Sequence, residues 1–251
     1  MIKFFRKIRY DLMEKNKTGK YFKYAIGEIV LVVIGILIAL QINNWNEQRK
    51  LSVELKEYLY KISDNVKQDI EQIQDLKIKR DTVRAKSMRS SIALMANDFT
   101  NIKDIFEGQA CFYEFYFIPD KSGFEALKNS TYLGKFNKSN VDSLLSLYYN
   151  RVDQTHMDEV SYNNFIENME VQISTRTDRT PLQTFFFKKF MNDEDLNINE
   201  YHEIVPYFKD NAFKSAVYRT LGERTYLVNY PKLIEIGNAL IHEINLFCEN
   251  E

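Results

Sequence analysis

Helix-breaking residues are scarce in this sequence. Only eight glycines and four prolines occur among its 251 residues, and neither type occurs from Ile36 to Glu107. Glycine and proline are the residues that most often end or interrupt a helix. Their absence from so long a stretch therefore favours long, continuous helices over a chain of short elements joined by turns.

Cysteine and recognisable catalytic motifs are also scarce. The two cysteines, Cys111 and Cys248, are too few for a disulfide framework. They either pair in an oxidising compartment or stay buried as free thiols, and free thiols are the simpler interpretation. Glycine-rich phosphate loops and the G-x-S-x-G, H-E-x-x-H and C-x-x-C motifs are missing. We therefore expect no catalytic residues and no cofactor, and a protein that is not an enzyme.

Three polar residues have a spacing that resembles that of metal ligands on a helix. Asp153, His156 and Glu159 follow one another at three-residue steps within a predicted helix. Carboxylate-rich helical bundles that bind two metal ions use a Glu-x-x-His step on each of two helices. The step occurs once here, and His242 has no acidic residue three positions before it. We interpret the three residues as a solvated polar face and expect no metal site.

Positive charge is concentrated at the start of the chain. Residues 1–23 hold eight basic and two acidic residues, a net +6, which leaves −7 for the rest of a chain whose total is −1. An acidic body lacks the positive surface that nucleic acid requires, so we expect no nucleic-acid partner. In the basic arm, apolar residues recur at helical spacing among the charges, which predicts an amphipathic helix on anionic lipid headgroups. A cytoplasmic protein is the alternative partner for the arm, whose basic residues include Lys3, Arg6, Lys7 and Arg9.

A long apolar run follows the basic arm. Residues 25–40 read AIGEIVLVVIGILIAL and contain one charge, Glu28, which lies one turn inside the boundary, where its side chain can reach the headgroups. A helix over 24–45 spans about 31 Å, which matches a hydrocarbon core of about 30 Å. A cleaved signal peptide is the alternative, but no small-residue cleavage site follows. Aromatic residues typical of membrane interfaces flank the run: Tyr21, Tyr24 and Trp45.

The position of the basic residues predicts the orientation. Lysine and arginine accumulate on the cytoplasmic side of a span. We therefore expect a basic cytoplasmic arm at 1–23, a transmembrane helix at 24–45 and an extracytoplasmic helical domain at 46–251. This places the chain in a bacterial inner membrane, with the domain in the periplasm of a Gram-negative host.

Small residues line one face of the predicted span. The four residues of this face lie four positions apart, three of them are small, and faces of small residues let two helices approach closely in lipid. A homodimer and an ordinary spanning helix are both compatible with this pattern. The face consists of Gly27, Leu31, Gly35 and Ala39.

The remaining pattern predicts an all-α fold. Apolar residues at three- and four-residue steps continue the first helix outward as a stalk, to about 87–95. A second long helix should run from Ser139 to Ile173, and a last element from 210 to 247, kinked or split by Pro231. Together they suggest an irregular antiparallel bundle.

Shorter segments are expected between the long helices. Residues 97–120 interrupt the helical pattern and should pack as an irregular segment across the helices. The alternative is that they form a hydrophobic ligand mouth, the entrance of a ligand-binding site. Ser122 should cap a short helix at 123–128. A further short helix is expected at 185–190, followed by an acidic loop at 192–200.

The membrane region carries a resemblance to a known family. The stretch AIGEIVLVVIGILIALQINNWNE, with the basic lead before it, resembles the opening signature of an uncharacterised bacterial single-pass membrane family, a domain of unknown function. Phe124–Lys128, FEALK, and the later Leu147-Tyr148-Tyr149 are similar to a second family pattern. The resemblance implies an anchor and a helical domain, and it implies no reaction.

Three functions are compatible with these signals. A membrane-anchored interaction or scaffold module with an unknown envelope partner is favoured, because the strong signals concern anchoring and helix packing. The alternative is an extracytoplasmic ligand-binding, sensor-like domain that acts through a separate partner, which a buried apolar cavity would support. An enzyme is the third, which a cleft with shifted carboxylates would support.

Overall fold

The computed structural model describes residues 10, 18–100, 102–132, 139–192, 194 and 197–250. Among these residues the regular elements are all helices and no strand occurs, so the all-α prediction is confirmed. The elements are α2 (Thr18–Met95), α3 (Ile102–Glu107), η1 (Gly108–Phe112), α4 (Ser122–Lys128), α5 (Asn140–Arg176), α6 (Thr180–Phe186), η3 (Phe187–Met191), α7 (Ile198–Lys209), α8 (Asn211–Leu221), η4 (Thr225–Asn229) and α9 (Tyr230–Asn250). The chain forms two compact units, Met1–Glu57 and Tyr58–Glu251, and α2 contributes to both.

The first unit contains the candidate membrane span. Within the described residues, one helix is long and apolar enough to cross a membrane, and its apolar window has a mean hydropathy of 2.6. None of that window is buried inside the chain. In a core helix of a soluble protein, neighbouring elements would cover such apolar side chains, whereas here they are uncovered.

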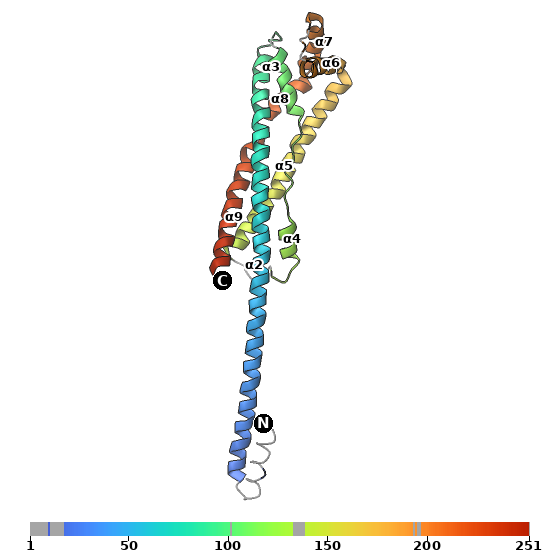
Figure 1. Ribbon diagram of the computed structural model, residues 1–251. Coiled ribbons are helices and arrows are strands. Elements are labelled where there is room, and N and C mark those ends of the chain that lie inside the picture. The colour runs from blue at the N-terminus through green and yellow to red at the C-terminus, as the bar shows by residue number, and fades with distance from the viewer. Residues whose placement is uncertain are drawn as a thin grey trace. The chain divides into compact units, whose positions relative to one another are not determined.

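The second unit is built around α2, α5 and α9. Helix α5 packs on α9 and α8, as Figure 1 shows. Each long helix buries residues at three- and four-residue steps, the spacing that keeps side chains on one face. The buried stripe of α2 includes Leu59, Ile62, Val66, Ile70, Ile73 and Leu76, as the sequence predicted.

The predicted start of α5 is also confirmed. The Ser139 hydroxyl accepts a hydrogen bond from the Asp142 backbone N–H at 3.1 Å, which satisfies one of the free donors at the helix start. The helix ends at Arg176, three residues beyond the predicted Ile173. A side-chain cap therefore fixes where this long helix begins.

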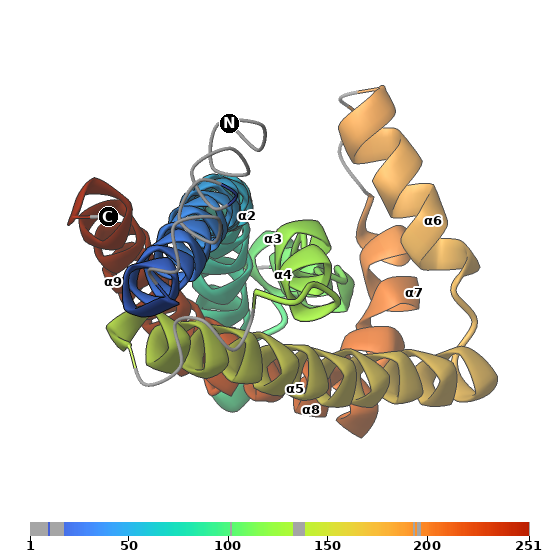
Figure 2. The same cartoon turned by 90° about the horizontal axis from the view of Figure 1, so that it is seen from below.

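Aromatic side chains fill the core where α2 ends. Phe106 of α3 meets Phe185 of α6 edge to face with ring centroids 4.3 Å apart, and Phe208 meets Phe213 at 5.1 Å. Edge-to-face pairs of this kind stabilise a core beyond the area that they bury. Helices α6 and α7 pack on each other in this region (Figure 2).

Several predicted short elements need correction. Helix α4 begins at Ser122, and the side chain that accepts from its first turn is Asp120, which takes the Ser122 N–H at 2.8 Å. The acidic loop at 192–200 is too long, because Asn197 and Glu200 form a capping box that starts α7 at Ile198. Residues 97–120 contain the helix α3, which the sequence pattern did not predict.

The last predicted element divides earlier than expected. It separates after Leu221, where α8 ends with Gly222 as its C-cap, and resumes through the π-helical turn η4. Pro231 is the second residue of α9. A proline in the first helical turn has no N–H that the helix would use, so it starts this helix rather than kinking it. The short helix expected at 185–190 begins earlier, at Thr180, and continues as η3.

Both cysteines are buried, and neither forms a disulfide with a described residue, as the simpler interpretation expected. Burial raises the pKa of the Cys111 thiol. A buried protonated thiol packs as a small apolar group rather than acting as a nucleophile.

Candidate functional site

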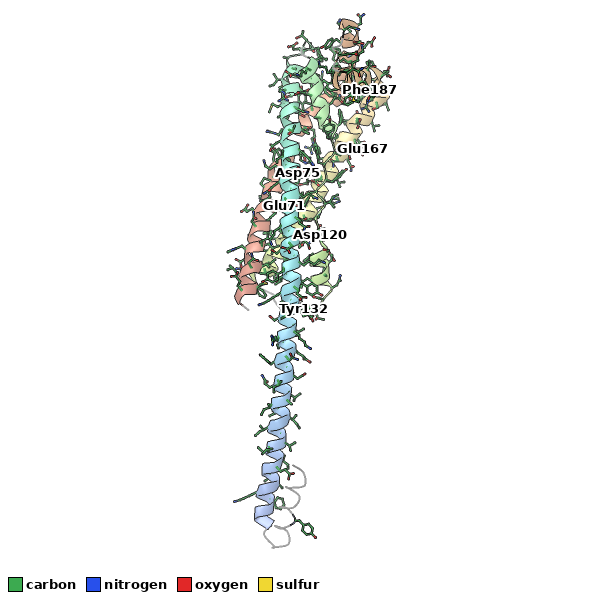
Figure 3. The ribbon with its side chains drawn as sticks, in the orientation of Figure 1. Glu71, Asp75, Asp120, Tyr132, Glu167 and Phe187 are labelled. Carbon is green, nitrogen blue, oxygen red and sulfur yellow. The ribbon has the colours of Figure 1, made fainter. Side chains whose placement is uncertain are left out.

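An extended segment at 113–121 crosses the second unit without a strand partner. Its backbone groups bond instead to side chains of the long helices. The Phe117 N–H donates to Glu159 of α5 at 3.0 Å, and the Asp120 N–H donates to Asp69 of α2 at 3.0 Å. Figure 3 shows Asp120 beside α2. The prediction of an irregular segment packed across the helices, made for 97–120, is confirmed for 113–120.

Further polar side chains of α2 hold the same segment. Gln72 accepts from the Ile118 N–H at 2.8 Å, and Asn65 accepts from the Gly123 N–H at 3.1 Å. Buried backbone groups are unfavourable without hydrogen bonds, so these side chains replace the ladder that a sheet would provide. The long helices therefore dictate the path of the segment.

Arg80 lies at the centre of the most polar part of the core. Its Nη1 donates to Glu223 in a short ion pair, and its Nη2 donates to the Phe115 carbonyl oxygen at 2.9 Å. The Nη2 atom lies 3.7 Å from Glu159 Oε1, which also accepts from the Tyr230 hydroxyl. We call Arg80, Glu159, Glu223 and Tyr230 the Arg80 cluster. It joins α2, α5 and the start of α9.

Aromatic rings surround the guanidinium of Arg80. Its Cζ lies 5.5 Å from the ring centroid of Phe115 and 5.7 Å from those of Tyr162 and Tyr230. A cation within about 6 Å of a ring centroid is attracted by the ring's quadrupole. The rings therefore help to hold a buried positive charge while excluding water from it.

The Arg80 cluster holds two carboxylates and one guanidinium. Burial raises the pKa of Glu159 and that of Glu223, although Arg80 opposes the shift in both. Burial by itself lowers the pKa of Arg80, but Glu223, Tyr230 and Glu159 together outweigh it, so the pKa is raised and the guanidinium stays charged. The Arg80 guanidinium thus lies beside two carboxylates, and burial favours the protonated form of both.

The Arg80 cluster is closed to ligands. Arg80 is 3% exposed and Glu159 is fully buried. Carboxylates with a shifted pKa indicate a catalytic site when they lie in a cleft, but Glu159 and Glu223 are buried in the core. Their arrangement therefore supports a structural role, the joining of three helices and the extended segment.

The interpretation of Asp153, His156 and Glu159 as one solvated face is wrong for Glu159. Asp153 and His156 are exposed, and Asp153 pairs with Lys121 at 2.7 Å. Glu159 belongs to the buried stripe instead, because it lies four residues after Thr155 and three before Tyr162. This spacing is the sequence feature that could have identified Glu159 as buried. Within the described ranges, no group of three His, Cys, Asp or Glu side chains could hold a metal ion.

An open pocket lies between α3, η1 and α6. Its volume is about 830 Å³, within the range of about 300–1,000 Å³ that small-molecule sites occupy. We call it the aromatic pocket, because rings form much of its wall. These wall residues include Phe106, Phe112, Tyr113, Phe185, Phe186 and Tyr201.

The aromatic pocket also has a polar side. Lys86 of α2, Lys103 of α3, Gln109 and Arg179 contribute to its lining, together with the acidic Glu107 and Glu170. Burial raises the pKa of the neighbouring Tyr207 to about 12, and its hydroxyl donates to Gln109 Oε1 at 3.3 Å. The arrangement can hold a molecule that is apolar over most of its surface and polar at one end. Part of its lining lies in 97–120, the segment for which a hydrophobic ligand mouth was the alternative interpretation.

The predicted membrane residues lie on the first unit. The face of Gly27, Leu31, Gly35 and Ala39 is exposed within the chain, and nothing lies within 4 Å of a Cβ built on either glycine. Trp45 is 64% exposed. Such a face is open to lipid or to a second helix.

The other predicted membrane residues cannot be placed. Tyr21 and Tyr24 belong to α2, but their side chains lie outside the described part of the structure. The residues of the basic arm also lie outside it: Lys3, Arg6, Lys7 and Arg9.

Comparison with known proteins identifies a family and no function. No curated protein and no solved structure matches the chain. One family model matches residues 28–206, and its description is a family of unknown function, DUF6090. The match begins in the apolar run and extends through α2, α5 and most of α7. The chain therefore belongs to this family of unknown function, DUF6090.

Proposed function

We propose that this chain is a single-pass protein of a bacterial inner membrane whose helical unit binds a small amphipathic ligand outside the cytoplasm. The aromatic pocket is the observation that carries the proposal. Its volume of about 830 Å³ and its mixed aromatic and polar lining suit such a ligand. The apolar run at 25–40 supports the anchor, and the basic residues before it support the orientation.

The pocket supports binding rather than catalysis. Rings of Phe106 and Phe185 offer apolar contact, and the lining holds neither cysteine nor histidine. The shifted carboxylates Glu159 and Glu223 do not line it. A binding site needs shape, apolar area and a few polar groups, and the pocket supplies these.

Photolabelling of the full chain in phosphatidylcholine nanodiscs tests the proposal. A palmitic acid and a hexadecanol that each carry a mid-chain diazirine are applied separately, and the labelled peptides are identified by mass spectrometry. Labelling by either probe in 102–113 and 179–189 is expected, in addition to labelling of the apolar run by probe dissolved in the bilayer. Labelling confined to the apolar run would contradict the proposal.

Two neighbouring positions on α6 provide a matched pair of variants. Gln183 and Thr184 are both exposed, but only Gln183 lines the aromatic pocket. Gln183→Trp should occupy the pocket mouth and reduce pocket labelling, whereas Thr184→Trp should leave it unchanged. Equal labelling of the two variants would show that the probes bind elsewhere.

A second candidate function is that of an interaction module. Phe186, Phe187 and Met191 are exposed on α6 and η3, and Phe186 and Phe187 stack edge to face at 6.0 Å. Phe187 is labelled in Figure 3. Exposed apolar clusters are typical of protein contact sites. A partner protein could therefore cover this surface.

Site-specific cross-linking separates this candidate from ligand binding. Benzoylphenylalanine at position 187 should cross-link a protein in intact cells, whereas the same residue at the exposed Val171 of α5 should not. Capture of the same protein from both positions would argue against a specific contact at Phe187.

A further inference from the structure

The charges that line the aromatic pocket are unequal. Four basic residues and two acidic residues contribute to the lining: Lys86, Lys103, Arg179, Lys189, Glu107 and Glu170. Both acids already have basic partners. Glu107 accepts from Arg89 Nε at 2.9 Å, and Glu170 lies 2.9 Å from Arg179 Nη1.

Two of the lysines have no acidic partner. Neither Lys86 nor Lys103 forms an ion pair with a described residue. They reach the pocket from different helices, α2 and α3. The pocket therefore presents net positive charge that the carboxylates of its own lining leave unbalanced.

Two buried hydrogen-bond donors in the lining also lack acceptors. Arg179 Nε and Gln109 Nε2 are shielded from solvent and have no hydrogen-bond partner among the described residues. One other atom of each group is engaged, since Arg179 Nη1 donates to Ser174 at 3.1 Å and Gln109 Oε1 accepts from Tyr207. A buried donor without an acceptor is unfavourable. A ligand that carries acceptor oxygens would supply what these two donors lack.

From this lining we propose that the aromatic pocket selects an anionic, single-chain amphiphile of the fatty-acid class. The apolar chain lies among the rings of Phe106, Phe112 and Phe185, and the carboxylate lies on the side of Lys86, Lys103 and Arg179. Charge complementarity sets the sign of the headgroup, and the unpaired donors set its need for acceptor oxygens. This inference rests on the proposed ligand-binding function and adds the class of ligand.

The test compares the diazirine-bearing palmitic acid with the matching hexadecanol on the full chain in neutral nanodiscs. Labelling of 102–113 and 179–189 is divided by labelling of the apolar run at 25–40, which corrects for the concentration of each probe in the bilayer. The acid should label the pocket about tenfold more than the alcohol, the effect of one charge-assisted hydrogen bond.

Variants of the unpaired lysines test the headgroup site. Lys86→Gln with Lys103→Gln should reduce pocket labelling by the acid towards that by the alcohol, and labelling by the alcohol should not change. Neither lysine has an acidic partner, so the fold should tolerate both changes. Lys232→Gln is the control, because Lys232 is exposed on α9 and does not line the pocket.

The outcomes separate the two proposals. Equal corrected labelling by the acid and the alcohol would overturn the selection of an anion while leaving ligand binding in place. Unchanged acid labelling in the double lysine variant would overturn the headgroup site. Failure of both probes to label the pocket would overturn the inference together with the proposed function.

Discussion

Arg80 forms ion pairs with both buried carboxylates, Glu159 and Glu223. Arg80→Met would leave both acids in the core without it. Removal of one partner from a buried ion pair typically destabilises a protein by about 3–5 kcal/mol. We expect a loss of this size, measured by thermal or urea unfolding of the full chain in detergent micelles and followed by circular dichroism.

A neighbouring lysine on α2 provides the control for Arg80. Lys79 pairs with Asp75 at 2.6 Å on the exposed surface, where both side chains are more than half exposed. Such pairs contribute about 0–1 kcal/mol, so Lys79→Met should change stability little. Similar stabilities of the two variants would contradict a structural role for the Arg80 cluster.

Glu159 makes stability depend on pH. Its pKa is raised by burial above the ordinary value of 4.5, so the folded chain holds the proton more tightly than the unfolded chain. The corresponding stability is fully present below the unfolded pKa and is lost as pH rises through the folded pKa. Glu159→Gln cannot ionise. The stability of the wild type relative to this variant should therefore fall as pH rises from about 4.5.

Unfolding curves of both proteins at several pH values between acid and neutral measure this difference. The Gln side chain keeps an oxygen that can accept from the Phe117 N–H or the Tyr230 hydroxyl, so the variant should fold. A stability difference that stays constant across the pH range would show that Glu159 does not titrate in the folded chain.

Sequence spacing predicts which polar residues are buried better than it predicts their partners. Arg80 lies four residues after Leu76 and three before Val83, and Glu159 occupies the equivalent place on α5, so each falls on a buried stripe. A polar residue on such a stripe could have been identified. Its partner could not, because the pair of Arg80 and Glu223 joins residues 143 positions apart, and only the packed helices bring them together.

At the scale of elements, close contact between α2 and α4 depends on a glycine. A Cβ at Gly123 would lie 2.7 Å from Asn65 Oδ1 and 3.0 Å from the Ile62 backbone nitrogen. Overpacking of a core typically costs about 1–3 kcal/mol, and we expect a loss in this range for Gly123→Ala. Gly222→Ala is the matched control, because nothing lies within 4 Å of its added Cβ. Equal stabilities of the two variants would show that α4 can shift away from α2.

The small-residue face of the apolar run predicts an effect on self-association. If two copies pack through Gly27, Gly35 and Ala39, Gly35→Ile should weaken the dimer, because the larger side chain separates the backbones. Leu37→Ala, on another face, should have much less effect. Cross-linking in membranes measures the dimer yield. Equal yields for the wild type and both variants would reject this face as the contact.

Long elements were predicted from the sequence more completely than short ones. The spacing of apolar residues on α2 and α5 repeats over many turns, so both ends of α5 and the last turns of α2 were predicted closely, whereas α2 begins at Thr18 rather than at 24. Helices α3 and α7 have 6 and 12 residues, too few turns for a periodic pattern to stand out. The aromatic pocket is built largely from such short elements, so the sequence pattern offered a ligand mouth at 97–120 as an alternative but did not identify the lining residues at 179–189.

At the scale of the whole molecule, the orientation of the apolar run in the membrane determines on which side the helical unit lies. In the proposed topology the basic arm is in the cytoplasm, and the helical unit with its aromatic pocket is on the other side of the membrane. An inverted chain would expose the pocket to cytoplasmic ligands instead, so orientation decides which molecules the pocket can meet.

Alkaline phosphatase fused after Glu251 measures that orientation directly, because the enzyme is active only outside the cytoplasm. Green fluorescent protein at the same position gives the opposite readout, since it fluoresces when it folds in the cytoplasm. For the proposed orientation we expect high phosphatase activity and no fluorescence in intact cells. A full-length phosphatase fusion without activity, together with a fluorescent partner fusion, would contradict it.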